Sequence, residues 1–212
     1  MDFEGATGGF THAPIDGQSG SSWTFDHWEH GTATSGPGAC HGGTGCWATH
    51  LAGNYVQCGR AMLRSPVIDL SACAGDAIKF TFWHWYDFQS PVWNGTTYAD
   101  GGLVEVSGDG GSTWHAATLT YPGTIEINGA MGWGYSCNAQ NSFYVDGQPG
   151  FIGSSGGWVL AELSLPPALR TATARVRFVY SSGVSYQTTS QSVSMTYTAP
   201  GWYLDDVAVV AE

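Results

Sequence analysis

The segment Gly201-Trp202-Tyr203-Leu204-Asp205-Asp206-Val207-Ala208-Val209-Val210 decides the fold, because its composition and alternation are those of a β-strand. Side chains alternate across a strand. One face is therefore expected to carry Tyr203, Asp205, Val207 and Val209, and the other Leu204, Asp206, Ala208 and Val210. If the valine-bearing face is the core, it brings the carboxylate of Asp205 to the edge of an apolar interior and leaves Asp206 pointing outward.

Burying the charged Asp205 carboxylate is unfavourable unless a cation or several hydrogen-bond donors meet it. The chain has only six Lys and Arg residues among 212, so a bound cation is a better candidate than a salt bridge. Hard oxygen ligands suit Ca²⁺, and the segment Asp2-Phe3-Glu4-Gly5 near the other end offers more of them. We expect the two ends of the chain to meet at a structural Ca²⁺ that locks a β-sandwich.

Size and charge restrict the class of protein. A chain of 212 residues fits one large β domain, expected to span residues 1–212. The formal net charge of −11 argues against nucleic acid as a partner, because a phosphate backbone demands clustered Lys and Arg. The sequence contains no run of eighteen apolar residues, so we expect no membrane insertion. No export signal precedes the first patterned segment, so we expect that signal to lie elsewhere in a longer parent chain.

The five cysteines lack the CxxC spacing of a zinc site and indicate disulfides. Cys40 and Cys46 bracket a short flexible loop that a bridge would close. Cys58 and Cys73 flank one strand and its turn, so we pair them as well, and Cys137 is then the odd thiol. Other pairings stay open on spacing alone. Disulfides together with few lysines and many glycines are typical of a secreted, extracellular protein.

Apolar residues alternate along most of the chain, and Gly or Gly-Ser clusters interrupt them about every ten residues, which predicts an all-β fold. The strongest strand runs from Ile78 to Tyr86, with Trp83 and Trp85 on the face opposite to Phe80, Phe82 and His84. Two long insertions, about 122–157 and 181–200, are rich in small polar residues. Loops of that length in compact domains tend to be functional.

The outward tryptophans of this strand have two readings. They either pack under a loop or another strand, or form a platform about 7 Å long, from the strand rise, on which sugar rings stack. Aromatic residues in the neighbouring loops would extend the platform. The candidate ligand-binding residues are therefore Trp83, Trp85, Trp93, Tyr98, Trp133 and Tyr135. A surface rich in amide and hydroxyl groups favours a neutral polysaccharide.

The segment Ser107-Gly108-Asp109-Gly110-Gly111-Ser112-Thr113-Trp114 predicts a hairpin, since Asp-Gly and Gly-Gly supply the positive φ angles of a tight turn. It resembles the Asp-box hairpin of sialidase propellers. Only one copy is present, which argues against a propeller. We assign the segment a structural role.

Several landmarks, in this order, resemble those of MAM-type jelly rolls and their bacterial relatives, the cleaved-adhesin and choice-of-anchor J domains. They are Asp2-Phe3-Glu4-Gly5, Leu63-Arg64-Ser65-Pro66, the aromatic strand at 80–86, Val104-Glu105-Val106-Ser107, Val176-Arg177-Phe178 and Trp202-Tyr203-Leu204-Asp205-Asp206-Val207. The resemblance implies an antiparallel jelly-roll β-sandwich. It also implies a calcium ion held between Glu4 and Asp205; we add Asp2 as a weaker third ligand and backbone carbonyls to complete the shell.

The sequence analysis predicts a secreted, calcium-stabilised and non-catalytic binding module, most readily for a polysaccharide or cell-surface glycan. One alternative is a protein-binding or stabilising accessory domain of an exported peptidase or adhesin. Another is a glycan-active jelly-roll enzyme in which Glu105, Glu126 and Glu162 converge. The pair His27 and His30 is not expected to act as a metal-binding or catalytic pair, because residues three apart fall on opposite faces of a strand.

Overall fold

The computed structural model describes residues 1–15, 26–73, 77–90, 92–93, 96–97, 100–127, 145–183, 187–189, 192–194 and 198–211. Its strands are β1 (Thr11–Pro14), β2 (Glu29–Gly31), β3 (Cys46–Ala48), β4 (Arg60–Arg64), β5 (Ile78–Asp87), β6 (Val92–Trp93), β7 (Thr96–Thr97), β8 (Gly101–Ser107), β9 (His115–Ala116), β10 (Gly123–Thr124), β11 (Pro149–Gly150), β12 (Val159–Ser164), β13 (Arg175–Ser181), β14 (Gln187–Thr189), β15 (Ser192–Ser194) and β16 (Gly201–Ala211). Two short 3-10 turns, η1 (Ser71–Cys73) and η2 (Pro167–Leu169), are the helical elements of these residues. None of the helices described is long and apolar enough to cross a membrane. The expected all-β fold is confirmed.

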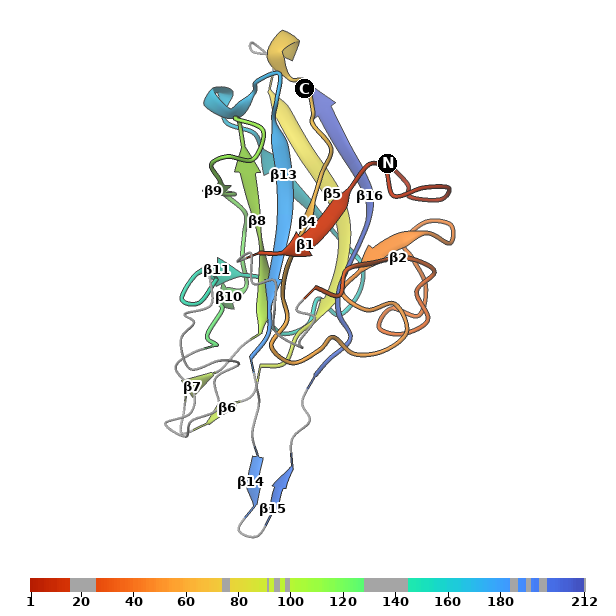
Figure 1. Ribbon diagram of the computed structural model, residues 1–212, viewed down its shortest axis with the longest axis vertical. Coiled ribbons are helices and arrows are strands. Elements are labelled where there is room, and N and C mark those ends of the chain that lie inside the picture. The colour runs from red at the N-terminus through yellow and green to blue at the C-terminus, as the bar shows by residue number, and fades with distance from the viewer. Residues whose placement is uncertain are drawn as a thin grey trace.

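Two five-stranded antiparallel sheets form the body of the protein and lie face to face in Figure 1. We call them sheet A, with the order β1-β4-β13-β8-β9, and sheet B, with the order β12-β5-β16-β3-β2. Several pairs join strands that are distant in sequence, as β5 pairs with β16 and β13 with β8. The result is the predicted β-sandwich.

Strand β5 supplies the centre of the core, as its alternation predicts. Phe80, Phe82 and His84 are buried, while the residues between them are partly exposed. His84 is neutral because its Nδ1 accepts a hydrogen bond from the indole N–H of Trp202 (3.2 Å) and burial lowers its pKa to about 3. A histidine can therefore occupy the apolar interior at no cost in buried charge.

The expected face assignment of the last strand is wrong for Asp205. Trp202 and Leu204 face the core, and a β-bulge between Asp205 and Ala208 then shifts the register against β5 so that Val207 turns inward. Asp206 is the residue that makes the shift, with a left-handed φ of 47°. Asp205 consequently lies on the outer face of sheet B, where it is nevertheless fully buried.

The start of the chain lies beside the last strand (Figure 1). Met1 and Val207 pair in both directions, because the Val207 N–H donates to the Met1 carbonyl (2.9 Å) and the Met1 nitrogen donates to the Val207 carbonyl. Asp205 is two residues from this contact and Glu4 three. The two ends therefore meet as expected.

The segment 107–114 is a turn of the expected Asp-box type. The Asp109 carboxylate accepts hydrogen bonds from the Thr113 N–H (2.9 Å), the Thr113 hydroxyl (2.7 Å) and the Ser107 hydroxyl (2.7 Å). These donors, led by the Thr113 N–H, hold the pKa of Asp109 far below its ordinary value. Both oxygens of the Asp109 carboxylate accept hydrogen bonds from within the turn, which supports the structural role.

Part of the first predicted insertion builds a small second core. The β10–β11 pair brings Ile125 and Val145 against Leu103 and Val179 on the outer face of sheet A. This apolar cluster covers one end of that face. The residues of the other end are polar and are considered below.

Trp202 is a fully buried core residue whose indole lies against the rings of Trp28, Phe88, Phe151 and Phe178. We expect Trp202→Ala to lower the free energy of unfolding by about 3–5 kcal/mol, because the cavity cannot refill. Val67→Ala, at an apolar side chain that is 46% exposed, serves as the control and should change it by less than about 0.5 kcal/mol. Equal denaturation midpoints for the two variants would contradict this packing.

Candidate functional site

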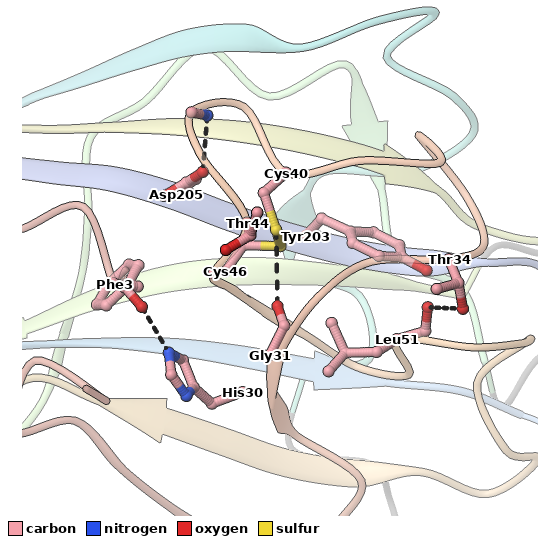
Figure 2. The surroundings of a disulfide bond; sticks show 12 residues. Phe3, His30, Gly31, Thr34, Cys40, Thr44, Cys46, Leu51, Tyr203 and Asp205 are labelled. Atoms are coloured by element: carbon pink, nitrogen blue, oxygen red, sulfur yellow. Dashed lines mark hydrogen bonds between the residues drawn. A yellow bond between two sulfur atoms is a disulfide. The ribbon is translucent and has the colours of Figure 1, made fainter. Parts of the chain in front are cut away.

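A disulfide-closed loop lies on the outer face of sheet B. Cys40 and Cys46 are bonded as expected, with their Cα atoms 5.6 Å apart. Figure 2 shows this bridge next to Tyr203 and close to Asp205 of the last strand. Closing a loop of this length stabilises a fold by about 2 kcal/mol through the unfolded chain. We call residues 40–46 the disulfide loop.

The second predicted bridge is wrong. Cys73 is a free, partly buried cysteine, whereas Cys58 is disulfide-bonded. Cys137 lies outside the described residues. The spacing argument failed because closeness in sequence across one strand does not bring two side chains to the same side of the fold.

Glu4 contacts the second half of the disulfide loop. Its carboxylate accepts hydrogen bonds from the N–H groups of Thr44 (2.8 Å) and Gly45 (2.9 Å) and from the Thr44 hydroxyl (3.2 Å). The Gly45 and Thr44 N–H groups hold the pKa of Glu4 below its ordinary value. Gly43 is required here, since a Cβ at this position would overlap the Glu4 carboxylate.

Asp205 and Asp206, at the bulge, contact the first half of the disulfide loop. The Gly42 N–H donates to Asp205 (3.0 Å), and the Asp206 N–H donates to the other oxygen of Asp205 (2.8 Å). The Asp206 carboxylate lies 2.7 Å from Nδ1 of His41. Burial raises the pKa of Asp205, and the adjacent charge of Asp206 adds to the rise.

Glu4, Asp205 and Asp206 thus all contact one short loop, and their described contacts include no Lys or Arg. His41 is the single titratable base among these contacts. Asp2, the expected third ligand, is exposed and accepts a long hydrogen bond from the Glu4 N–H (3.4 Å). Among the described residues, no three His, Cys, Asp or Glu side chains converge as a metal-binding group.

An aromatic surface adjoins the loop on the same face. The His41 ring stacks on Trp83 with centroids 4.0 Å apart and planes 13° apart, and it meets Trp158 edge-on at 5.7 Å. Leu160 of β12 pairs with Trp83 and is 46% exposed. We call His41, Trp83, Trp158, Leu160 and Asp206 the aromatic patch.

The other predicted platform residues differ in position. Trp85 packs edge-on against Tyr203 (5.5 Å) and lies close to Gly36, and like Trp83 it is partly buried. Trp93 belongs to β6, and its side chain is outside the described part, as are Tyr98, Trp133 and Tyr135 entirely. Sequence reasoning missed His41 and Trp158. His41 lies in a loop and Trp158 immediately precedes a strand, and alternation does not predict which strand or ring such residues will contact.

The residues proposed for catalysis do not share one site. Glu105 lies on the outer face of sheet A, where Arg177 binds it, whereas Glu162 lies on the outer face of sheet B, 3.2 Å from Lys79. The sandwich separates these two carboxylates. His30 Nε2 lies 2.9 Å from the Phe3 carbonyl oxygen (Figure 2), a contact within the fold.

No family model and no curated protein matches the sequence. Among solved structures, the chain is similar to the K2 cleaved adhesin domain of Lys-gingipain, with 16% identity, a TM-score of 0.49 and coverage of 97% of this chain and 93% of that one. It is also similar to the K3 cleaved adhesin domain of Lys-gingipain from Porphyromonas gingivalis, with 18% identity, a TM-score of 0.46 and coverage of 99% and 95%. At TM-scores below 0.5, neither likeness carries over what those domains do.

The contact between Glu4 and the disulfide loop can be tested with two glycines. Gly43 (φ 50°) and Gly38 (φ 75°) both adopt left-handed backbone, so alanine strains both. Only at Gly43 does the new Cβ also displace Glu4, whereas at Gly38 it meets open space. We expect Gly43→Ala to lower the melting temperature clearly more than Gly38→Ala. Equal losses would show that the Glu4 contact contributes nothing to stability.

Proposed function

We propose that this chain is a non-catalytic, extracellular binding module that recognises carbohydrate through the aromatic patch. The observation that carries the proposal is the cluster of half-exposed Trp83 and Trp158 rings around the His41–Asp206 pair. The Cys40–Cys46 disulfide fits an oxidising compartment outside the cell.

The chemistry of the aromatic patch suits a sugar ring. Indole faces bind the C–H face of a pyranose, while hydroxyl groups need acceptors and donors at the rim. Asp206 and His41 keep 35% and 28% of their side-chain surfaces exposed and supply these rim groups. Exposed Leu160 adds apolar area beside Trp83. Aromatic rings beside the hydrogen-bonded His41–Asp206 pair favour a sugar as the ligand, because an apolar protein surface would leave these polar groups without partners.

The glycan prediction is tested by binding to a panel of insoluble polysaccharides and a glycan array. We expect Trp83→Ala and Trp158→Ala each to weaken binding about tenfold, because each removes one stacking surface. Trp114→Ala is the matched control, since Trp114 is a half-exposed tryptophan near sheet A. Its binding should equal that of the unchanged protein.

Three other results would contradict this reading. Equal binding by all three tryptophan variants would exclude the aromatic patch as the contact surface. Capture of protein partners alone, with no glycan retained, would favour an accessory domain of an exported peptidase or adhesin. Soluble product released from the polysaccharides would establish an enzyme.

We further propose that Ca²⁺ binds where the disulfide loop meets the ends of the chain. Two observations support the proposal: Glu4 and Asp205 both contact the disulfide loop, and Asp205 is fully buried with no Lys or Arg among its described contacts. Glu4 and Asp205 would be the carboxylate ligands, with backbone carbonyls completing the shell. A bound ion would neutralise charge that burial now makes unfavourable, and it would fasten the loop.

Chelation tests the calcium proposal. With Ca²⁺ about 100-fold above its Kd, linkage gives a rise in melting temperature of about 5–10 °C for a chain of this size, and EGTA should reverse it. Asp205→Ala should abolish the response to added Ca²⁺. Glu162→Gln is the control, since this exposed carboxylate pairs with Lys79, and it should keep the response. Unchanged melting curves in both tests would rule the site out.

A further inference from the structure

The basic residues of this acidic chain gather on the outer face of sheet A. One row of paired residues crosses this face from β1 to β9, in the order Thr11, Arg64, Arg177, Glu105 and Ala116. Arg175 lies one outward-facing position further along β13 and pairs with Ser107. Three of the six basic side chains therefore occupy adjacent outward positions on two neighbouring strands.

Arg177 is neutralised within the fold. Its Nε donates to Glu105 at 2.6 Å, and both side chains are largely buried, with exposures of 8% and 6%. The guanidinium also lies 4.3 Å from the centroid of the Trp114 ring, within cation–π range. Glu105 is thereby used by Arg177, its own cross-strand neighbour.

Arg64 and Arg175 have no such counter-charge in the part of the chain that the structure describes. Arg64 Nη2 donates one long hydrogen bond to the Thr11 hydroxyl (3.4 Å), and Arg175 Nη1 donates to the Ser65 carbonyl (2.8 Å). Their Nε atoms are buried without an acceptor. Burial lowers the pKa of Arg175, and the charge of Arg64 lowers it further. Because Arg64 pairs with Arg177 and Arg175 lies two residues before it on β13, Arg64 and Arg175 are diagonal neighbours on one face. Two half-buried like charges in these positions are unfavourable without an anion.

The surroundings hold these two side chains in place. A Cβ added at Gly111 of the Asp-box turn would meet the Trp114 ring (3.1 Å) and Cδ of Arg175 (3.8 Å), so the turn packs beside the aliphatic part of the Arg175 side chain. Arg64 and Arg175 are half-buried rather than extended into solvent. Because less side-chain freedom remains to be lost, a ligand meets donors that are already positioned.

We propose that Arg64 and Arg175 form a binding site for one oxyanion group, a sulfate, phosphate or carboxylate, carried by a ligand that is otherwise uncharged. Guanidinium groups bind such oxyanions through paired, charge-assisted hydrogen bonds. The net charge of −11 repels polyanions at long range, so a sparsely charged ligand fits better than a polymer such as nucleic acid. This site is independent of the aromatic patch, because it lies on the opposite outer face of the sandwich.

Titration with sodium sulfate, sodium phosphate and sodium acetate at constant ionic strength tests the proposal and separates the three groups. The readout is the NMR signal of each arginine Nε–H. We expect the signals of Arg64 and Arg175 to shift saturably, with that of Arg170 as the internal control. Arg64→Gln and Arg175→Gln should each weaken the apparent affinity about tenfold, from the loss of one charged donor pair. Lys79→Gln should leave it unchanged.

Two results would overturn the proposal. Parallel, non-saturating shifts of all arginine signals would mean that the anions act only through general screening. Equal affinities for the unchanged protein and both glutamine variants, in folded samples with cooperative melting, would exclude Arg64 and Arg175. If either glutamine variant fails to fold, the saturable shift in the unchanged protein still decides the question, and Arg175→Lys preserves the charge for comparison.

Discussion

The bulge at Asp206 determines how the rest of the site is built. Without it, strict alternation would keep one phase along β16, and Val207 would follow Asp205 onto the outer face. The left-handed φ of 47° at Asp206 instead lets Trp202 and Leu204 face the core before it and Val207 after it. The shift leaves two adjacent carboxylates free to contact the disulfide loop, and the loop in turn positions His41 over Trp83.

The two outer faces differ in the charges that gather on them, although each carries both signs, with Lys79 on sheet B and Glu105 on sheet A. Carboxylates from both ends of the chain converge on sheet B, where amide N–H groups and one histidine meet them. Arginines converge on sheet A, where Arg177 forms an ion pair with Glu105 and lies over the ring of Trp114. Because burial makes an unbalanced charge costly, both arrangements favour ligands of opposite sign. The two proposed sites, for a cation on one face and for an oxyanion on the other, therefore rest on the same physical argument.

Much of the fold could be predicted from alternation, turn residues and cysteine spacing. The strand from Ile78 to Tyr86 occupies the centre of the core, the Asp-box segment forms its turn, and the Cys40–Cys46 bridge closes its loop. Prediction failed where a single residue changes the phase, as at Asp206, since period-2 reasoning contains no signal for a bulge. It failed again for Cys73, where pairing depends on geometry between distant segments.

The functional surfaces were harder to predict than the strands because they depend on register. Trp83 is opposite Leu160 and Asp205, and Arg64 is opposite Arg177; none of these pairs is close in sequence. Covering loops matter equally. Trp85 packs against Tyr203 and lies close to Gly36, whereas Trp83 stacks on His41, although both tryptophans are partly buried. Two tryptophans that are equivalent in the alternating pattern therefore have different neighbours, because different parts of the loops lie over them.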